Sequence, residues 1–137
     1  MHYLTTHIEF SAYHRLFNPE FSDEKNHEIY QECVRGHGHN YILEVTVHGQ
    51  SRKDTGIVMD LKKLNHLLMT EIFPFVDHKS LNDDVPFLKN INPTAENISM
   101  AFWNIIQEKL RDAALYRIRL SESDRNIVEY FGHHSNR

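Results

Sequence analysis

Residues 41–48 constrain the fold more than any other segment, because their side chains alternate between apolar and polar character. Tyr41, Leu43, Val45 and Val47 share one parity, and the positions that follow Leu43 on the other parity are polar. Successive side chains of a β-strand point to opposite faces, so this period of two predicts a strand with one buried face. Such a strand needs neighbouring strands and a second layer of structure over its apolar side.

Three other segments show a similar alternation and supply neighbours for this strand. They are residues 3–12, 115–122 and 127–131, and a short returning strand is predicted at 57–59, after a polar turn. Residues 16–32 are mostly polar, so we expect a loop with one or two helical turns there, able to lie over a site.

Two helices are predicted from apolar residues at helical spacing. Asp60 is a suitable N-cap for the first helix, which we expect to end at Pro74. Thr94 is a suitable N-cap for the second, whose apolar stripe runs from Ile98 to Ile106. The order of strands and helices predicts an α+β fold, with an antiparallel sheet and both helices on one face.

Composition limits the domain count and the classes of partner. The 137 residues contain no linker or repeat, so we expect one domain over residues 1–132 and a polar tail at 133–137. A net charge of −4 provides no basic field for nucleic acid or an anionic membrane. The start of the chain does not resemble a secretory leader, and Cys33 is the single cysteine, so we expect a cytoplasmic protein without disulfides.

Histidines gather just before the clearest strand. His37 and His39 are separated by one residue, so on a strand both imidazoles point to the same face and can share a metal ion. His14 is the candidate third ligand, although the pattern alone leaves His7, His27 and His48 as alternatives. Three histidines would hold zinc with a fourth position open, which is typical of catalytic sites.

Further residues are candidates for acid-base chemistry or substrate binding, and each could instead have a purely structural role. Cys33, four positions before His37, is either a small buried side chain or a thiolate activated by the metal. Asp77 and His78 form either a proton relay or a simple turn. Glu122 shares parity with buried strand positions, so it is either a strand-end surface residue or an inward carboxylate able to grip a guanidine-like edge.

These residues lie in motifs that resemble those of the 6-pyruvoyl-tetrahydropterin and 6-carboxytetrahydropterin synthases. The motifs occur in the family's order and span nearly the whole chain. They are FSAYHR at 10–15, CVRGHGHNY at 33–41, TGIVMD at 55–60, VDHKSLN at 76–82, NPTAEN at 92–97 and SES at 121–123.

The resemblance implies the T-fold, a four-stranded antiparallel sheet with two helices on one face. It further implies that three sheets join into a β-barrel, that two trimers stack as a homohexamer, and that the sites lie at subunit interfaces. The substrate would be 7,8-dihydroneopterin triphosphate, with Zn2+ and no organic cofactor. The implied roles are zinc ligands for His14, His37 and His39, catalysis for Cys33, Asp77 and His78, and pterin binding for Glu122, Thr94 and Glu96.

The motifs leave two products to distinguish. The spacing of Cys33 from the His-Gly-His sequence resembles the 6-carboxytetrahydropterin synthases of the queuosine route, which release acetaldehyde as well as triphosphate. Residues 22–26, 39–41 and 126–128 look more like the 6-pyruvoyl synthases of the tetrahydrobiopterin route. The cysteine loop is expected to contact the reacting side chain, so the carboxy product is the first prediction and the pyruvoyl product the alternative.

Two other functions remain open. The chain could be a non-catalytic, zinc-containing T-fold module that holds a pterin or purine through Glu122. It could also catalyse aldol cleavage to a hydroxymethylpterin, in which a glutamate such as Glu32 acts near the cysteine, although the parity of Glu32 differs from that of Cys33. From their charge, Arg15 and Lys79 are candidate contacts for the triphosphate.

Overall fold

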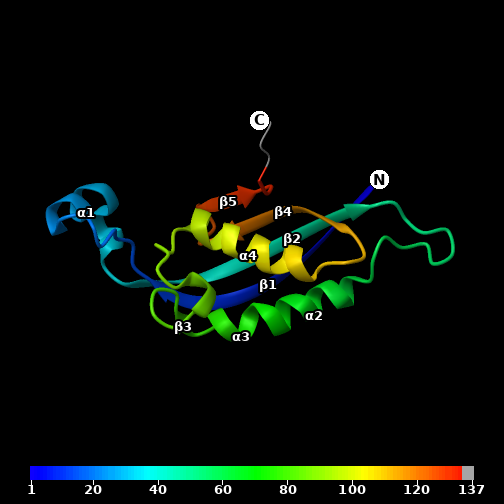
Figure 1. Cartoon of the computed structure of the whole chain (residues 1–137), viewed down its shortest axis with the longest axis horizontal. Helices are drawn as coiled ribbons and strands as arrows, with labels where there is room; N and C mark the ends of the chain where they lie inside the picture. The colour runs from blue at the N-terminus through cyan, green and yellow to red at the C-terminus, as the bar shows by residue number, and fades with distance from the viewer. Residues whose placement is uncertain (134–137) are drawn as a thin grey trace.

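The computed structural model of the chain describes residues 1–133. Its centre is a five-stranded sheet with the order β3-β1-β2-β4-β5, and the long β1 and β2 run side by side through the molecule (Figure 1). The strands are β1 (His2–His14), β2 (His37–Gly49), β3 (Lys79–Ser80), β4 (Ala114–Ser121) and β5 (Ile127–Tyr130).

The predicted four-stranded antiparallel sheet is present as β1, β2, β4 and β5. The fifth strand was not predicted: β3 pairs with Ala12 and Tyr13 of β1 in parallel, which makes the whole sheet mixed. A two-residue strand leaves no period in the sequence, because alternation needs about four residues before it can be recognised.

The main helices lie on one face of the sheet, as the sequence predicted. They are α2 (Leu61–Glu71), α3 (Phe73–Val76) and α4 (Ala95–Lys109). Asp60 caps α2 by accepting from the Lys62 N–H, and Thr94 caps α4 by accepting from the Asn97 N–H. The apolar stripes of α2 and α4 join one hydrophobic core with the inward side chains of β1, β2 and β4.

Two local predictions were wrong. Residues 57–59 form no strand, because β2 already pairs with β1 on one edge and with β4 on the other, so a returning chain finds no free edge beside β2. Val58 and Met59 are nevertheless buried, which explains the apolar pattern. Pro74 does not end the first helix: α2 ends at Glu71, and Pro74 lies in the first turn of α3, where its missing N–H costs nothing.

The connection between β1 and β2 lies beyond the end of the sheet. It contains α1 (Asp23–Tyr30) and the 3-10 helix η1 (Gln31–Val34), and α1 projects away from the other layers (Figure 1). A second 3-10 helix, η2 (Pro86–Leu88), precedes α4.

Of the predicted polar tail, His133 is exposed and residues 134–137 lie outside the described part of the chain. No helix within residues 1–133 is long and apolar enough to span a membrane.

Candidate active site

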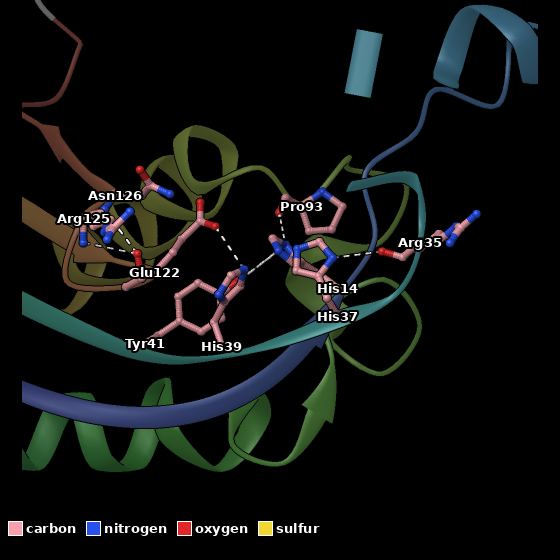
Figure 2. Close-up of polar contacts among 10 residues, drawn as sticks. His14, Arg35, His37, His39, Tyr41, Pro93, Glu122, Arg125 and Asn126 are labelled. Carbon is pink, nitrogen blue, oxygen red and sulfur yellow. Dashed lines mark hydrogen bonds and ion pairs between the residues drawn. The ribbon is translucent and has the colours of Figure 1, made fainter. Parts of the chain in front are cut away.

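Strand pairing brings the three predicted histidines together. His14 is the last residue of β1 and lies opposite His37, the first residue of β2, while His39 lies opposite Ala12. One ring nitrogen from each of His14, His37 and His39 falls within 4.8 Å of the other two, and the imidazoles converge in Figure 2. The predicted convergence is confirmed, and the antiparallel register is the reason that His14 is the third member.

Backbone carbonyls orient two of these rings. Nδ1 of His14 lies 2.8 Å from the carbonyl oxygen of Pro93, and Nδ1 of His37 lies 2.9 Å from that of Arg35 (Figure 2). A carbonyl can only accept, so each Nδ1 carries a proton, and Nε2 is the ring nitrogen left for a ligand. Metal-binding histidines are commonly held in this way by the second ring nitrogen.

The electrostatics of the cluster also fit a cation. Burial lowers the pKa of His14 to about 4, with His37 and His39 acting in the same direction, and burial lowers the pKa of His39 as well. Both rings are therefore neutral at pH 7, which is the form that binds metals. Within residues 1–133 the buried Nε2 of His39 makes no hydrogen bond, although a carboxylate oxygen of Glu122 lies 3.3 Å away. A divalent cation held by these nitrogens would satisfy that atom.

A half-buried carboxylate stands beside the histidines. An oxygen of Glu122 lies 3.3 Å from Nε2 of His39, and both side chains are 22% exposed (Figure 2). Burial raises the pKa of Glu122, and the nearby charge of Glu96 acts in the same direction against the opposing effect of His37. The two predicted pterin-binding carboxylates are thus close enough to interact.

Thr94 has a structural role that the sequence already indicated. Its hydroxyl accepts from the Asn97 N–H at 3.1 Å as the N-cap of α4. The residue before it, Pro93, supplies the carbonyl that orients His14. The start of α4 therefore contributes to the cluster mainly through its backbone.

The predicted Asp77–His78 pair exists. Nδ1 of His78 lies 2.7 Å from a carboxylate oxygen of Asp77, whose other oxygen accepts from the Ser11 N–H at 3.0 Å. The ring of His78 is exposed, and its backbone has φ of 58°. A non-glycine residue with positive φ costs free energy and is enriched at functional sites. The pair directly precedes the edge strand β3, and the His78 N–H also donates to the Ser11 carbonyl of the neighbouring β1.

Cys33 lies in η1 and is exposed. Among residues 1–133 its thiol makes no hydrogen bond with the three histidines or with the Asp77–His78 pair, and it is not part of the histidine cluster. Next to η1 is a pocket of about 610 Å³, lined by residues of the Arg15–Glu20 segment, by Tyr30, and by residues on both sides of η2, among them Asn82 and Asn92. Arg15 lines this pocket with its guanidinium 4.4 Å from the centre of the Phe17 ring.

The chain has well-matched relatives. The family model described as 6-pyruvoyl tetrahydropterin synthase matches residues 3–133. The 6-pyruvoyl tetrahydrobiopterin synthase of Dictyostelium discoideum is 40% identical over 94% of this chain and 95% of its own length. The protein of the same name from Homo sapiens is 41% identical, over 91% of this chain and 88% of its own.

The chain belongs to the 6-pyruvoyl tetrahydropterin synthase family. Enzymes of this family are lyases, and so is this protein. The solved 6-pyruvoyl tetrahydropterin synthase of Caenorhabditis elegans superposes with a TM-score of 0.90 at 32% identity, covering 96% of this chain and 95% of that one. The family also includes 6-carboxy-5,6,7,8-tetrahydropterin synthases; that of Rickettsia bellii is 28% identical over 91% of this chain.

Sequence reasoning missed the groups that hold the site of this family member in place. These are the carbonyls of Pro93 and Arg35, and the side chain of Tyr41, whose hydroxyl lies 3.3 Å from Nδ1 of His14. Backbone acceptors have no signature in the sequence, because every residue carries one. Tyr41 has the same parity as His37 and His39, so the sequence did indicate that its side chain lies on the same face of the sheet.

Proposed function

We propose that this lyase converts 7,8-dihydroneopterin triphosphate into 6-pyruvoyl-tetrahydropterin and triphosphate. The observation that carries the proposal is the convergence of three histidine nitrogens, two of them oriented through Nδ1 by carbonyls, beside a half-buried carboxylate. Formally, the side chain loses triphosphate and becomes a diketone, while the ring gains hydrogen at N5 and C6. The reaction balances without an external oxidant or reductant.

We assign Zn2+ to His14, His37 and His39. Three imidazoles with an open fourth position suit a catalytic zinc site. When bound, the ion supplies Lewis-acid polarisation to oxygens of the substrate side chain and so makes the neighbouring protons more acidic.

The residues of the chain would then bind the ring and move the protons. Glu122, with Glu96 nearby, would hold the guanidine-like edge of the pterin, because a carboxylate accepts two parallel N–H bonds from such an edge. Cys33 would take a proton from the side chain. His78, held at Nδ1 by Asp77, presents Nε2 for proton transfer. Arg15, which lines the neighbouring pocket, is a candidate for the triphosphate.

The pyruvoyl product was the alternative in the sequence analysis, and the relatives favour it over the carboxy product that the cysteine spacing indicated. The relatives named 6-pyruvoyl synthases match this chain at 40–41% identity, whereas the 6-carboxy relative from Rickettsia bellii matches at 28%. Cys33 lies in a short 3-10 helix outside the sheet. The number of residues between such a helix and a strand can change without altering the strand-borne groups, so this spacing is a weak indicator of the product.

We further propose that the working unit is a homohexamer. Within residues 1–133 the exposed Cys33 makes no hydrogen bond with the Asp77–His78 pair, which supports sites shared between subunits, in which a neighbouring copy completes the set. The helix-free face of the sheet and the exposed edge of β5 are surfaces on which barrel closure could occur.

Mass analysis of the product from dihydroneopterin triphosphate tests the function directly. We expect 6-pyruvoyl-tetrahydropterin, one triphosphate per turnover and no acetaldehyde. Acetaldehyde together with a 6-carboxypterin would move the chain to the other branch of the family. Binding of the pterin without any product would favour the non-catalytic module, and a hydroxymethylpterin would favour aldol cleavage.

A further inference from the structure

We propose that Asn92 is a positioning residue that ties the Cys33-bearing segment to the histidine cluster. The segment is residues 15–36, named here the cysteine arm, which joins β1 to β2 and contains α1 and η1. The effect on turnover rests on the proposed function, in which Cys33 acts as a base. The hydrogen bonds from Asn92 to the arm, named here the tether, are a property of the fold and do not depend on that function.

The cysteine arm is not fixed by core burial. Asn26 is the only buried residue of α1, and η1 has none. Asn26 binds within the arm, accepting from the Asn18 N–H at 2.8 Å and donating to the Asn18 carbonyl at 2.9 Å. An element without apolar contacts to the core takes its position from a few polar contacts, so each of these contacts matters more than it would in the core.

Asn92 makes two of those contacts, one to each side of the arm. Its Oδ1 accepts from the Phe17 N–H at 3.1 Å, where the arm leaves β1, and its Nδ2 donates to the Tyr30 hydroxyl at 3.2 Å, at the end of α1. The amide orientation is determined, because a backbone N–H can only donate and must face the oxygen. Tyr30 directly precedes η1, which contains Cys33.

The backbone around Asn92 faces the other half of the site. The next carbonyl, that of Pro93, holds Nδ1 of His14 at 2.8 Å. The Asn92 carbonyl is itself fixed by the side chain of Asn97 at 2.9 Å, on the first turn of α4. Two consecutive residues therefore orient a histidine of the cluster on one side and the cysteine arm on the other.

The strands provide one direct contact between cluster and arm, from Nδ1 of His37 to the Arg35 carbonyl at 2.9 Å, and it lies after Cys33 in the chain. The Leu16 N–H donates to the Cys33 carbonyl at 2.7 Å, which closes the arm on itself. Asn82 holds the backbone of Arg15 through two hydrogen bonds of 2.9 Å, but this is only the first residue of the arm. The side chain of Asn92 contacts the arm at Tyr30, which immediately precedes η1 and Cys33.

Tyr30→Phe tests the tether by removing one hydroxyl and leaving the loop at Asn92 intact. We expect amide hydrogen exchange in residues 30–35 to speed up about fivefold, the factor that corresponds to one hydrogen bond. We expect kcat to fall by a similar factor with KM and metal content unchanged, since a misplaced general base slows the chemistry without weakening ring binding. Asn92→Ala removes both contacts, so its effects should exceed about tenfold.

Matched controls separate this role from general loss of stability. Tyr3→Phe removes a hydroxyl for which no hydrogen bond is recorded among residues 1–133, and Asn104→Ala changes an exposed asparagine of α4. Both should keep wild-type exchange in the arm and wild-type kcat. Wild-type exchange and kcat in both Tyr30→Phe and Asn92→Ala would overturn the inference even if Cys33→Ala abolishes turnover. Full turnover in Cys33→Ala would instead overturn the proposed role of the cysteine, and exchange would still decide the tether.

Discussion

The histidine cluster and the cysteine arm lie at the same end of the molecule but are built in different ways. His14, His37 and His39 stand on two thirteen-residue strands that pair along their whole length, so their relative positions follow from the sheet register. Cys33 stands on an exposed 3-10 turn that is held by isolated hydrogen bonds. The difference indicates that one half of the site is preformed by the fold, whereas the other depends on local contacts.

This contrast suits the chemistry that we propose. Metal ligands must converge within a few tenths of an ångström of a fixed geometry, and a sheet provides that accuracy. A proton-transferring group needs to approach the substrate closely, and a mobile element can also admit substrate and release product. The two halves should therefore respond differently to mutation.

Loss of a metal ligand should have the largest effect. His37→Ala removes one of three nitrogens, so we expect metal content to fall from about one ion per chain to near zero and turnover to fall by at least ~10³-fold. Metal analysis by mass spectrometry and product assay measure both. His66→Ala, on the exposed face of α2, is the control and should retain metal and activity. A metal-replete, active His37→Ala protein would contradict the ligand assignment.

Removal of the Cys33 thiol should lower turnover without changing metal binding by the histidine cluster. We expect Cys33→Ala to reduce turnover by about 10²- to 10⁴-fold, the usual contribution of a general base, while metal content stays at the wild-type level. The cysteine is exposed and contributes nothing to the core, so the melting temperature should be unchanged. If this variant loses its metal, the halves are coupled more tightly than the structure indicates.

The two regions also differ in how far the sequence predicted them. Alternation gave β2, and the H-x-H spacing placed His37 and His39 on one face. The choice of His14 needed the register across a connection of more than twenty residues, which no local pattern contains. The family motifs supplied it instead, because they report a known arrangement.

The position of the cysteine arm and the residues that hold it could not be predicted from sequence patterns, for physical reasons. Its position depends on single hydrogen bonds, such as that between Asn92 and Tyr30, whose partners are 62 positions apart. The helix caps at Asp60 and Thr94 were predictable because a cap acts within three residues. The false strand at 57–59 arose because burial of Val58 and Met59 resembles a strand pattern, whereas strand formation needs a free sheet edge.

The smallest expected effect concerns the Asp77–His78 pair, which lies outside both regions. The hydrogen bond from the Ser11 N–H, together with His78, lowers the pKa of Asp77 below its ordinary value of 3.8. A carboxyl with a lowered folded-state pKa contributes stability above the unfolded value, and that contribution is lost as pH falls through the folded value. Asp77→Asn should therefore be less stable than wild type at pH 7, by at most ~1 kcal/mol given the exposure of His78, and the difference should disappear in strong acid.

Urea unfolding at pH 7 and at a pH below the lowered pKa of Asp77 measures this difference. Asp124→Asn, at an exposed position in the β4–β5 turn, is the control and should follow wild type at both pH values. Metal content and the exchange of the cysteine arm should remain as in wild type, because Asp77 contacts neither. A stability difference that persists unchanged in acid would mean that the Asp77 charge is not what holds this corner, and that the amide substitution disturbs the Ser11 backbone contact instead.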